Sequence, residues 1–172
     1  MEAYTDLITR RSVRQYKNTP VPRELIERVI NAGLHAPSGL NKQSPIIVAV
    51  TDKALRDRIA QLNAAVMGRD TDPFYGAPVV LVVLANKNVP TYVYDGSLTM
   101  GNLMLAAHEC GLGSCWIHRA REVFNSDKGR EILASLGISG DYEGIGNCIL
   151  GFADTELPEP AERHDGRVFW AE

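Results

Sequence analysis

The chain has 172 residues, of which 45% are hydrophobic and 23% charged, and its formal net charge at pH 7 is −3. These values are typical of one globular domain, 1–172, which would bury roughly 70% of its unfolded surface. The weakly acidic balance gives no indication of nucleic-acid binding, and no apolar stretch approaches the ~20 residues that span a bilayer. The N-terminus lacks the basic and apolar regions of a signal peptide, so we expect a cytoplasmic protein.

The first half of the chain predicts helices around one buried strand. A short helix should end near Arg10, and a second, with apolar positions at helical spacing, should run from Pro22 to about Leu34. The β-branched run 46–50 predicts a buried strand. Asp52 can then cap a helix whose apolar residues recur at helical spacing as far as Val66.

The second half contains the strongest strand signal. The polar segment 68–76 predicts a loop, and the run 78–85 is apolar on both faces, as in a central strand of a covered sheet. The helix expected over 92–110 is apolar nearly all round and should be buried in the core or at a subunit interface. Further elements are a strand at 114–117, a helix at 121–136 and a last strand at 145–153. The tail ends in Val168-Phe169-Trp170 and is expected to be held down on something.

Several motifs that carry chemistry are absent from the sequence. The three cysteines have no CxxC spacing and are interpreted as reduced thiols, and the four histidines form no pair at metal-ligand spacing. Gly111 and Gly113 follow a helix and precede a strand, which is the reverse of the dinucleotide-binding order. No Gly-x-Ser-x-Gly elbow occurs. If the chain is an enzyme, a cofactor other than a metal must supply the reactive atoms.

A basic cluster follows the first helix and consists of Arg10, Arg11, Ser12 and Arg14. Guanidinium groups match phosphate oxygens in a bidentate way. Arg163, in the irregular tail, would complete a phosphate pocket assembled from both ends of the chain. The alternative is that these arginines only complement the helix C-terminus and stay solvated.

Two further segments are candidates for contact with a flat heterocycle. The loop 37–41 has a small-residue backbone that can approach a ring closely and an amide for its edge. Its alternative is an ordinary helix-to-strand connection. The segment 111–117 is the second candidate, and its alternative is a helix C-cap that leads into a strand.

Five motifs occur in the order and spacing of the FMN-dependent nitroreductase family, which the chain resembles over nearly its whole length. They are Arg-Arg-Ser-Val-Arg, Ala-Pro-Ser-Gly-Leu-Asn-x-Gln, Gly-Ala-Pro-Val-Val, Gly-Leu-Gly-Ser-Cys-Trp-Ile and Leu-Gly-Phe-Ala-Asp. No single motif is specific for this family, but the five together, in this order and at this spacing, are. The resemblance implies an α+β fold with three α/β/α layers and a mixed, mostly antiparallel sheet. It also implies an intertwined homodimer with FMN at the interface.

The resemblance implies roles for individual residues. Arg10, Ser12 and Arg163 resemble the phosphate and ribityl contacts, and Arg14 resembles the cation near the pyrimidine edge of the flavin. The loop contributed by the partner chain corresponds to Pro37, Ser38, Gly39 and Asn41. The segment whose backbone N–H groups face flavin N5 and O4 corresponds to Cys115, Trp116, Ile117, His118 and Arg119.

The chain departs from the family pattern at two places. Larger members often carry an acidic residue and a glycine at the positions of His118 and Arg119, and a lysine at that of Ala161. The phosphate site would therefore depend more on Arg11 and Arg163. The chain also lacks an obvious lid insertion around 68–76.

The activity that the resemblance implies is hydride transfer from NADH or NADPH through flavin N5 to a nitroaromatic, quinone or similar small acceptor, by a ping-pong mechanism. No side chain needs to be a nucleophile, and Phe74 and Tyr75 are candidate walls of the substrate pocket. Alternatives are another chemistry on the same fold (dehalogenation, flavin fragmentation or azoline oxidation) or a flavin-binding protein without turnover. The sequence does not distinguish NADH from NADPH.

Overall fold

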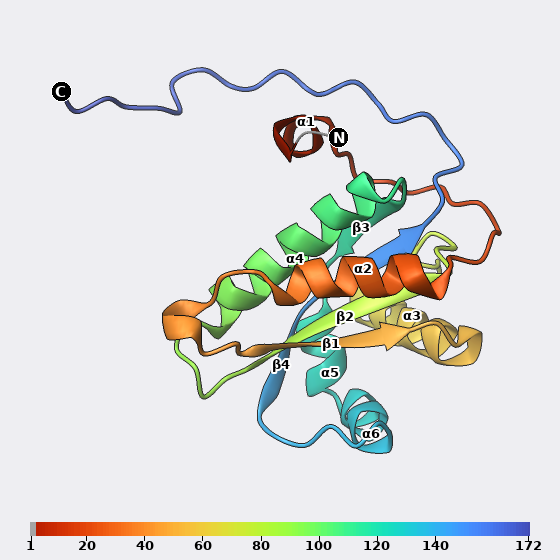
Figure 1. Ribbon diagram of the computed structural model, residues 1–172. Helices are drawn as coiled ribbons and strands as arrows, with labels where there is room; N and C mark the ends of the chain where they lie inside the picture. The colour runs from red at the N-terminus through yellow and green to blue at the C-terminus, as the bar shows by residue number, and fades with distance from the viewer. Residues whose placement is uncertain (1–2) are drawn as a thin grey trace.

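The computed structural model describes residues 3–172 and contains a four-stranded sheet between two layers of helices (Figure 1). The strands are β1 (Pro45–Val50), β2 (Val79–Asn86), β3 (Gly113–Ile117) and β4 (Tyr142–Gly151). Their order is β1-β2-β4-β3, and each neighbouring pair is antiparallel. The segment after the first helix lies beside β3, with a parallel bridge between Ser12 and Ser114. This bridge places the basic cluster at the β3 edge of the sheet.

The helices cover both faces of the sheet. One face carries α2 (Arg23–Leu34) and α4 (Tyr92–Glu109), and the other carries α3 (Lys53–Met67), α5 (Ala120–Asn125) and α6 (Asp127–Ser135) (Figure 1). The short α1 (Ala3–Thr9) lies near the C-terminal end of α4, and a 3-10 turn, η1 (Gly39–Asn41), follows α2. The three-layer arrangement expected from the resemblance is therefore confirmed.

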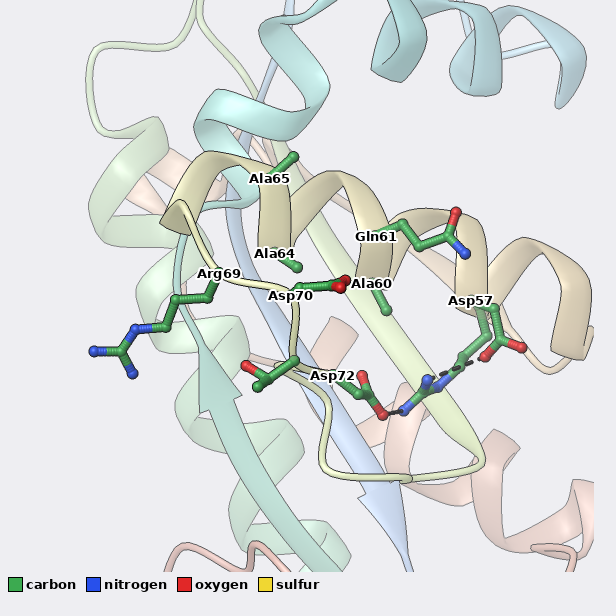
Figure 2. Close-up of a pocket in the computed structure, with 10 residues that line it drawn as sticks. Asp57, Ala60, Gln61, Ala64, Ala65, Arg69, Asp70 and Asp72 are labelled. Carbon is green, nitrogen blue, oxygen red and sulfur yellow. Dashed lines mark hydrogen bonds and ion pairs between the residues drawn. The ribbon is translucent and has the colours of Figure 1, made fainter.

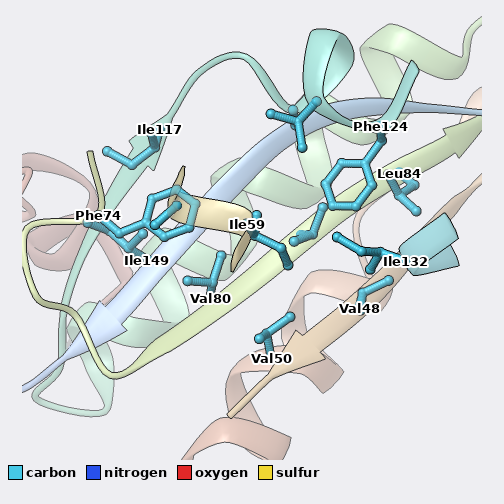
Figure 3. Close-up of a cluster of buried hydrophobic side chains, with 14 of the residues drawn as sticks. Val48, Val50, Ile59, Phe74, Val80, Leu84, Ile117, Phe124, Ile132 and Ile149 are labelled. Atoms are coloured by element: carbon cyan, nitrogen blue, oxygen red, sulfur yellow. The ribbon is translucent and has the colours of Figure 1, made fainter. Parts of the chain in front are cut away.

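Side chains of β2 alternate between two hydrophobic clusters. Val80 and Leu84 point into the cluster under α3, α5 and α6 (Figure 3), whereas Leu81 and Val83 pack with Leu103 of α4 on the opposite face. All five residues have no exposed surface. Fully burying each of these side chains contributes about 1.5–3 kcal/mol. The prediction of a central strand that is covered on both faces is confirmed.

The single helix expected over 121–136 is in fact two. Ser126 is extended (φ −74°, ψ 157°), and its hydroxyl accepts the N–H of Gly129 at 3.1 Å, so Ser126 caps α6. A Cβ at Gly129 would lie 2.0 Å from the carbonyl oxygen of Val123. The glycine therefore permits the close packing of α6 on α5 that the break produces.

The last strand begins at Tyr142, earlier than the expected 145. A β-bulge between Val83 and Leu84 extends the pairing, so that Gly144 lies opposite Leu84 and Glu143 opposite Ala85. A Cβ at Gly144 would lie 2.3 Å from the backbone of Ala120. This glycine, which weakens the strand signal, is required by the close approach of α5.

The C-terminal tail first runs beside the N-terminal segment, where the N–H of Asp154 donates to the carbonyl oxygen of Gln15 at 3.0 Å, and then extends away from the body (Figure 1). Its end is open in a single chain, and Trp170 is 84% exposed. The expectation that this end is held down on something stays a prediction. No helix within residues 3–172 is long and apolar enough to cross a membrane.

The loop 68–76 is held by the buried residue Arg56 of α3. Arg56 Nη2 donates to Asp72 at 2.6 Å, and its Nε donates to the carbonyl oxygen of Ala77 at 3.0 Å. Asp72 in turn accepts the N–H groups of Phe74 and Gly76 at 2.9 and 2.8 Å. The guanidinium also lies over the Phe74 ring, 5.4 Å from its centroid. These contacts fix the loop against the sheet.

Arg56→Ala is expected to lower the free energy of unfolding by about 1.5–3 kcal/mol, because it removes a buried guanidinium that bonds Asp72 and the backbone of Ala77 and supports the loop. Arg58, also on α3, provides the matched control, because it pairs with Glu131 at 3.2 Å on the surface. Arg58→Ala should change the free energy by less than about 0.5 kcal/mol. Urea denaturation of both variants measures the difference, and equal effects would contradict this role of Arg56.

Candidate functional site

The two ends of the described chain meet at a hollow of about 900 Å³, which we call the arginine hollow. Residues 7–11 form one side of it and residues 157–163 the other. The structure therefore brings Arg10 and Arg11 together with Arg163, although more than 150 residues separate them in the sequence. This is the grouping that the sequence suggested.

Two guanidinium nitrogens near this hollow have no partner. Arg10 Nη1 and Arg11 Nε are buried and make no hydrogen bond within residues 3–172. Arg11 is oriented by its Nη1, which donates to the carbonyl oxygens of Ile8 and Arg10 at 2.8 and 2.7 Å. A buried donor without a partner costs about 1–3 kcal/mol, more when it is charged. Three arginines outnumber the glutamates Glu159 and Glu162 in the lining of this hollow. Donors without partners at such a place suit an anion with several oxygens, such as a phosphate.

Two further hollows continue along the segment 10–14. A middle hollow of about 320 Å³ is formed by residues 12–15 and 155–158, so Ser12 and Arg14 line it. Arg14 also lines a pocket of about 550 Å³ together with Tyr75 and residues 115–119. We call this last one the Tyr75 pocket. The middle hollow shares Leu157 and Pro158 with the arginine hollow, and it shares Arg14 with the Tyr75 pocket. The three hollows therefore form one row beside β3.

Two buried asparagines hold the backbone that follows β3. Asn63 of α3 donates its Nδ2 to the carbonyl oxygen of His118 at 2.8 Å and accepts Arg119 Nε at 3.0 Å. Asn147 of β4 donates to the carbonyl oxygens of Ile117 and His118 at 3.3 and 3.4 Å. Neither asparagine has exposed surface. The segment 117–119 is therefore fixed from two elements.

The loop 37–41 is anchored by the buried carboxylate of Asp95, in the first turn of α4. Asp95 accepts the N–H of Gly39 at 2.9 Å and the hydroxyls of Ser44 and Thr91 at 2.7 and 3.1 Å. Burial by itself would raise the pKa of Asp95, but these three donors hold it below its usual range. A Cβ at Gly39 would lie 2.3 Å from Thr91 Oγ1, so only glycine fits there.

The structure does not bring this loop to the row of hollows. The loop contacts the N-terminal end of α4, whereas Thr9 meets His108 near the C-terminal end at 2.9 Å. Helix α4 has 18 residues, which corresponds to a length of about 27 Å. Pro37, Ser38, Gly39 and Asn41 are therefore separated from the arginines by the length of this helix (Figure 1).

The two aromatic residues expected in a substrate pocket have different environments. Phe74 has no exposed surface and lies in the core (Figure 3), where the guanidinium of Arg56 covers its ring, so it does not line the pocket. Tyr75 is 44% exposed and lines the Tyr75 pocket with Trp116. Phe74 is therefore a core residue and not a wall of the substrate pocket, because its ring packs inside the protein. Tyr75 remains the candidate aromatic wall.

Among residues other than glycine, left-handed backbone in the described chain occurs only in or next to these segments. Within residues 3–172, a positive φ at a residue other than glycine occurs only at Leu40, Asn41, Gln43, Tyr75 and Arg119. Leu40 and Asn41 belong to the anchored loop, Gln43 follows it and donates its N–H to Ser38 Oγ at 3.0 Å, and the other two line the Tyr75 pocket. Strained backbone of this kind persists where the surrounding structure holds it and is common at functional sites.

Comparison with known proteins finds one family. The family model described as the Nitroreductase family matches residues 7–73 and 68–153. A Methanothermobacter thermautotrophicus protein, provisionally named NADH dehydrogenase/NAD(P)H nitroreductase, is 29% identical over 121 residues, which are 67% of this chain and 60% of that protein. The Archaeoglobus fulgidus protein of the same name is 30% identical over 164 residues, 92% of this chain and 86% of the relative.

A solved structure shows the same fold along both complete chains. The nitroreductase with bound FMN from Bacteroides fragilis superposes with a TM-score of 0.88 at 24% identity, covering 100% of this chain and 100% of that one. Family model, relative and fold lead to one conclusion: the chain belongs to the nitroreductase family.

Proposed function

We propose that the chain is an FMN-dependent oxidoreductase that uses NADH or NADPH to reduce a small acceptor such as a nitroaromatic or a quinone. The observation that carries this proposal is the row of hollows beside β3, with unpartnered nitrogens of Arg10 and Arg11 at one end. The names of the two relatives include NAD(P)H, and the structure from Bacteroides fragilis contains FMN.

The residues along the row fit the parts of FMN in order. Arg10, Arg11 and Arg163 would hold the phosphate in the arginine hollow, and Ser12 would bind next to it. Arg14 would lie near the pyrimidine edge, where its charge stabilises negative charge on the reduced ring. When bound, the flavin supplies the hydride acceptor and donor of the reaction. The segment 117–119, held by Asn63 and Asn147, would present its backbone to the ring edge.

The proposed enzyme is a homodimer, because one chain holds only part of the site. The loop 37–41 and the arginines lie at opposite ends of α4, so the loop must come from a partner. The outer side of α4 is apolar and open: Tyr94 is 73% exposed, Leu98 is 48% exposed, and a Cβ at Gly101 would meet nothing within 4 Å. Antiparallel pairing of two α4 helices about a two-fold axis would bring each loop to the other chain's arginines.

The visible spectrum of the purified protein tests the proposal. We expect flavin absorption bands that bleach on anaerobic addition of NADH or NADPH and return when a nitroaromatic or quinone is added. A protein that remains colourless after incubation with FMN would refute the proposal. Bands that neither donor bleaches would indicate a flavin-binding protein without this turnover.

A further inference from the structure

We infer that the Tyr75 pocket binds a co-substrate through an anionic group, a carboxylate or a phosphate, with Arg69 as the main contact. This inference rests on the proposed function, because the pocket is the place where donor and acceptor would reach the flavin. It goes further by assigning a chemical class to the molecule that enters. Three observations carry it: the charge of the lining, the availability of Arg69 and the aromatic wall.

The lining of the Tyr75 pocket is strongly basic. Among the described residues it includes Arg14, Arg69, His118 and Arg119, and the one acidic member is Asp72. The carboxylate of Asp72 is already bonded to Arg56 and to two backbone N–H groups. The positive charge of the pocket is therefore not neutralised from within. Cations gathered around one hollow raise the local concentration of anions, and a bound anion relieves their mutual repulsion.

Arg69 is free to make this contact. Its side chain is exposed and takes part in no ion pair or hydrogen bond found between residues 3 and 172. Figure 2 shows it extending away from Asp57 and Asp72, out of the neighbouring hollow of about 350 Å³ between α3 and the segment 69–72. Arg14 is assigned to the flavin, and Arg119 Nε is engaged by Asn63. Among the arginines that line this pocket, Arg69 is thus the one whose guanidinium is available to a second molecule.

The backbone of Arg69 is nevertheless well fixed. Gly68 ends α3 in the left-handed conformation (φ 65°), and the N–H of Arg69 donates to the carbonyl oxygen of Ala64 at 3.2 Å. Beyond it, the contacts of Arg56 and Asp72 hold the loop that presents Tyr75. The backbone of Arg69 and of Tyr75 is therefore held on one short loop, and both side chains extend from it toward the pocket that they line. This arrangement suits a flat molecule that carries a negative group at its edge.

The test compares molecules that differ in charge and little else. We would measure kcat/KM for para-nitrobenzoate against para-nitrobenzamide, and for NADPH against NADH, in the wild type, in Arg69→Gln and in Arg130→Gln. Arg130 is an exposed arginine on α6 and serves as the control. A preference for para-nitrobenzoate would show that the pocket recognises an anionic group of the acceptor. A preference for NADPH would show that it recognises the extra phosphate of the donor.

We expect the wild type to prefer the more negatively charged member of at least one pair by roughly fivefold, the value of a favourable exposed charge pair. Arg69→Gln should abolish this preference and leave the less charged member, the amide or NADH, unchanged, whereas Arg130→Gln should alter neither. The preference should also fall between about 0.01 M and about 0.1 M salt, as the Debye length shortens from about 30 Å to about 10 Å. Equal rates within both pairs, or a preference that survives Arg69→Gln, would overturn the inference.

A binding measurement keeps this inference separate from the proposed function. Isothermal titration of the purified protein with para-nitrobenzoate should show binding that weakens in Arg69→Gln and is roughly fivefold weaker for the amide. If the protein binds no FMN and reduces nothing, the proposed function fails, and this titration still decides whether the pocket selects anions. If turnover occurs but the titration shows no dependence on charge, only the present inference fails.

Discussion

Arg10→Ala is expected to weaken FMN binding by roughly 10- to 100-fold while leaving riboflavin binding nearly unchanged. A hydrogen bond to a charged group contributes about 1.5–3 kcal/mol. Arg10 lines the arginine hollow and carries a buried nitrogen without a partner. Its contribution should therefore depend on the phosphate, which riboflavin lacks. Quenching of flavin fluorescence during titration of the protein gives both dissociation constants.

The same substitution should not destabilise the cofactor-free protein. A buried guanidinium nitrogen without a partner is unfavourable in the empty site, so its removal should leave the free energy of unfolding unchanged or raise it. Added FMN should then stabilise the wild type far more than Arg10→Ala. Arg130→Ala provides the control for a lost surface charge. If Arg10→Ala weakened riboflavin and FMN binding equally, the phosphate assignment would be wrong.

The sequence predicts the sheet and its two helical layers well because each signal is local. The run 78–85 is apolar on both faces, and β2 is buried on both faces. Asp52 is followed by helical periodicity, and its carboxylate does cap α3 by accepting the N–H of Leu55 at 2.8 Å. The break between α5 and α6 is different, because it depends on how closely Gly129 approaches the preceding helix. That approach is tertiary and leaves no periodic signal.

The candidate site is only partly visible in the sequence for a similar reason. Short motifs indicate the arginines and the segment after β3, but Asn63 and Asn147 belong to no motif. Their signal is a polar amide on the apolar face of a helix, as Asn63 four residues after Ile59, or within an apolar run of a strand, as Asn147 beside Cys148 and Ile149. An amide at such a position must find partners, and here they are the carbonyl oxygens of Ile117 and His118. Which carbonyls these are depends on strand order and cannot be read from one strand.

The proposal of a shared site predicts that two defective chains can restore each other. One variant would lack the cations, as Arg10→Ala with Arg163→Ala. The other would have a displaced loop, as Gly39→Val, because a Cβ at position 39 already meets Thr91 Oγ1 at 2.3 Å. Each homodimer should bind FMN poorly at both of its sites. In a mixed dimer, one site would combine the intact arginines of the second chain with the intact loop of the first.

Random pairing of the two chains makes half of the dimers mixed, and each mixed dimer has one intact site of two, so roughly a quarter of all sites should recover FMN binding. Co-expression followed by titration with FMN measures this fraction, and light scattering confirms that the particles are dimers. The FMN binding of each variant expressed alone gives the background that is subtracted. Sites built within single chains would show no recovery, because each chain would still carry its own defect. Recovery therefore requires arginines and loop to meet across two chains, as their separation by the length of α4 implies.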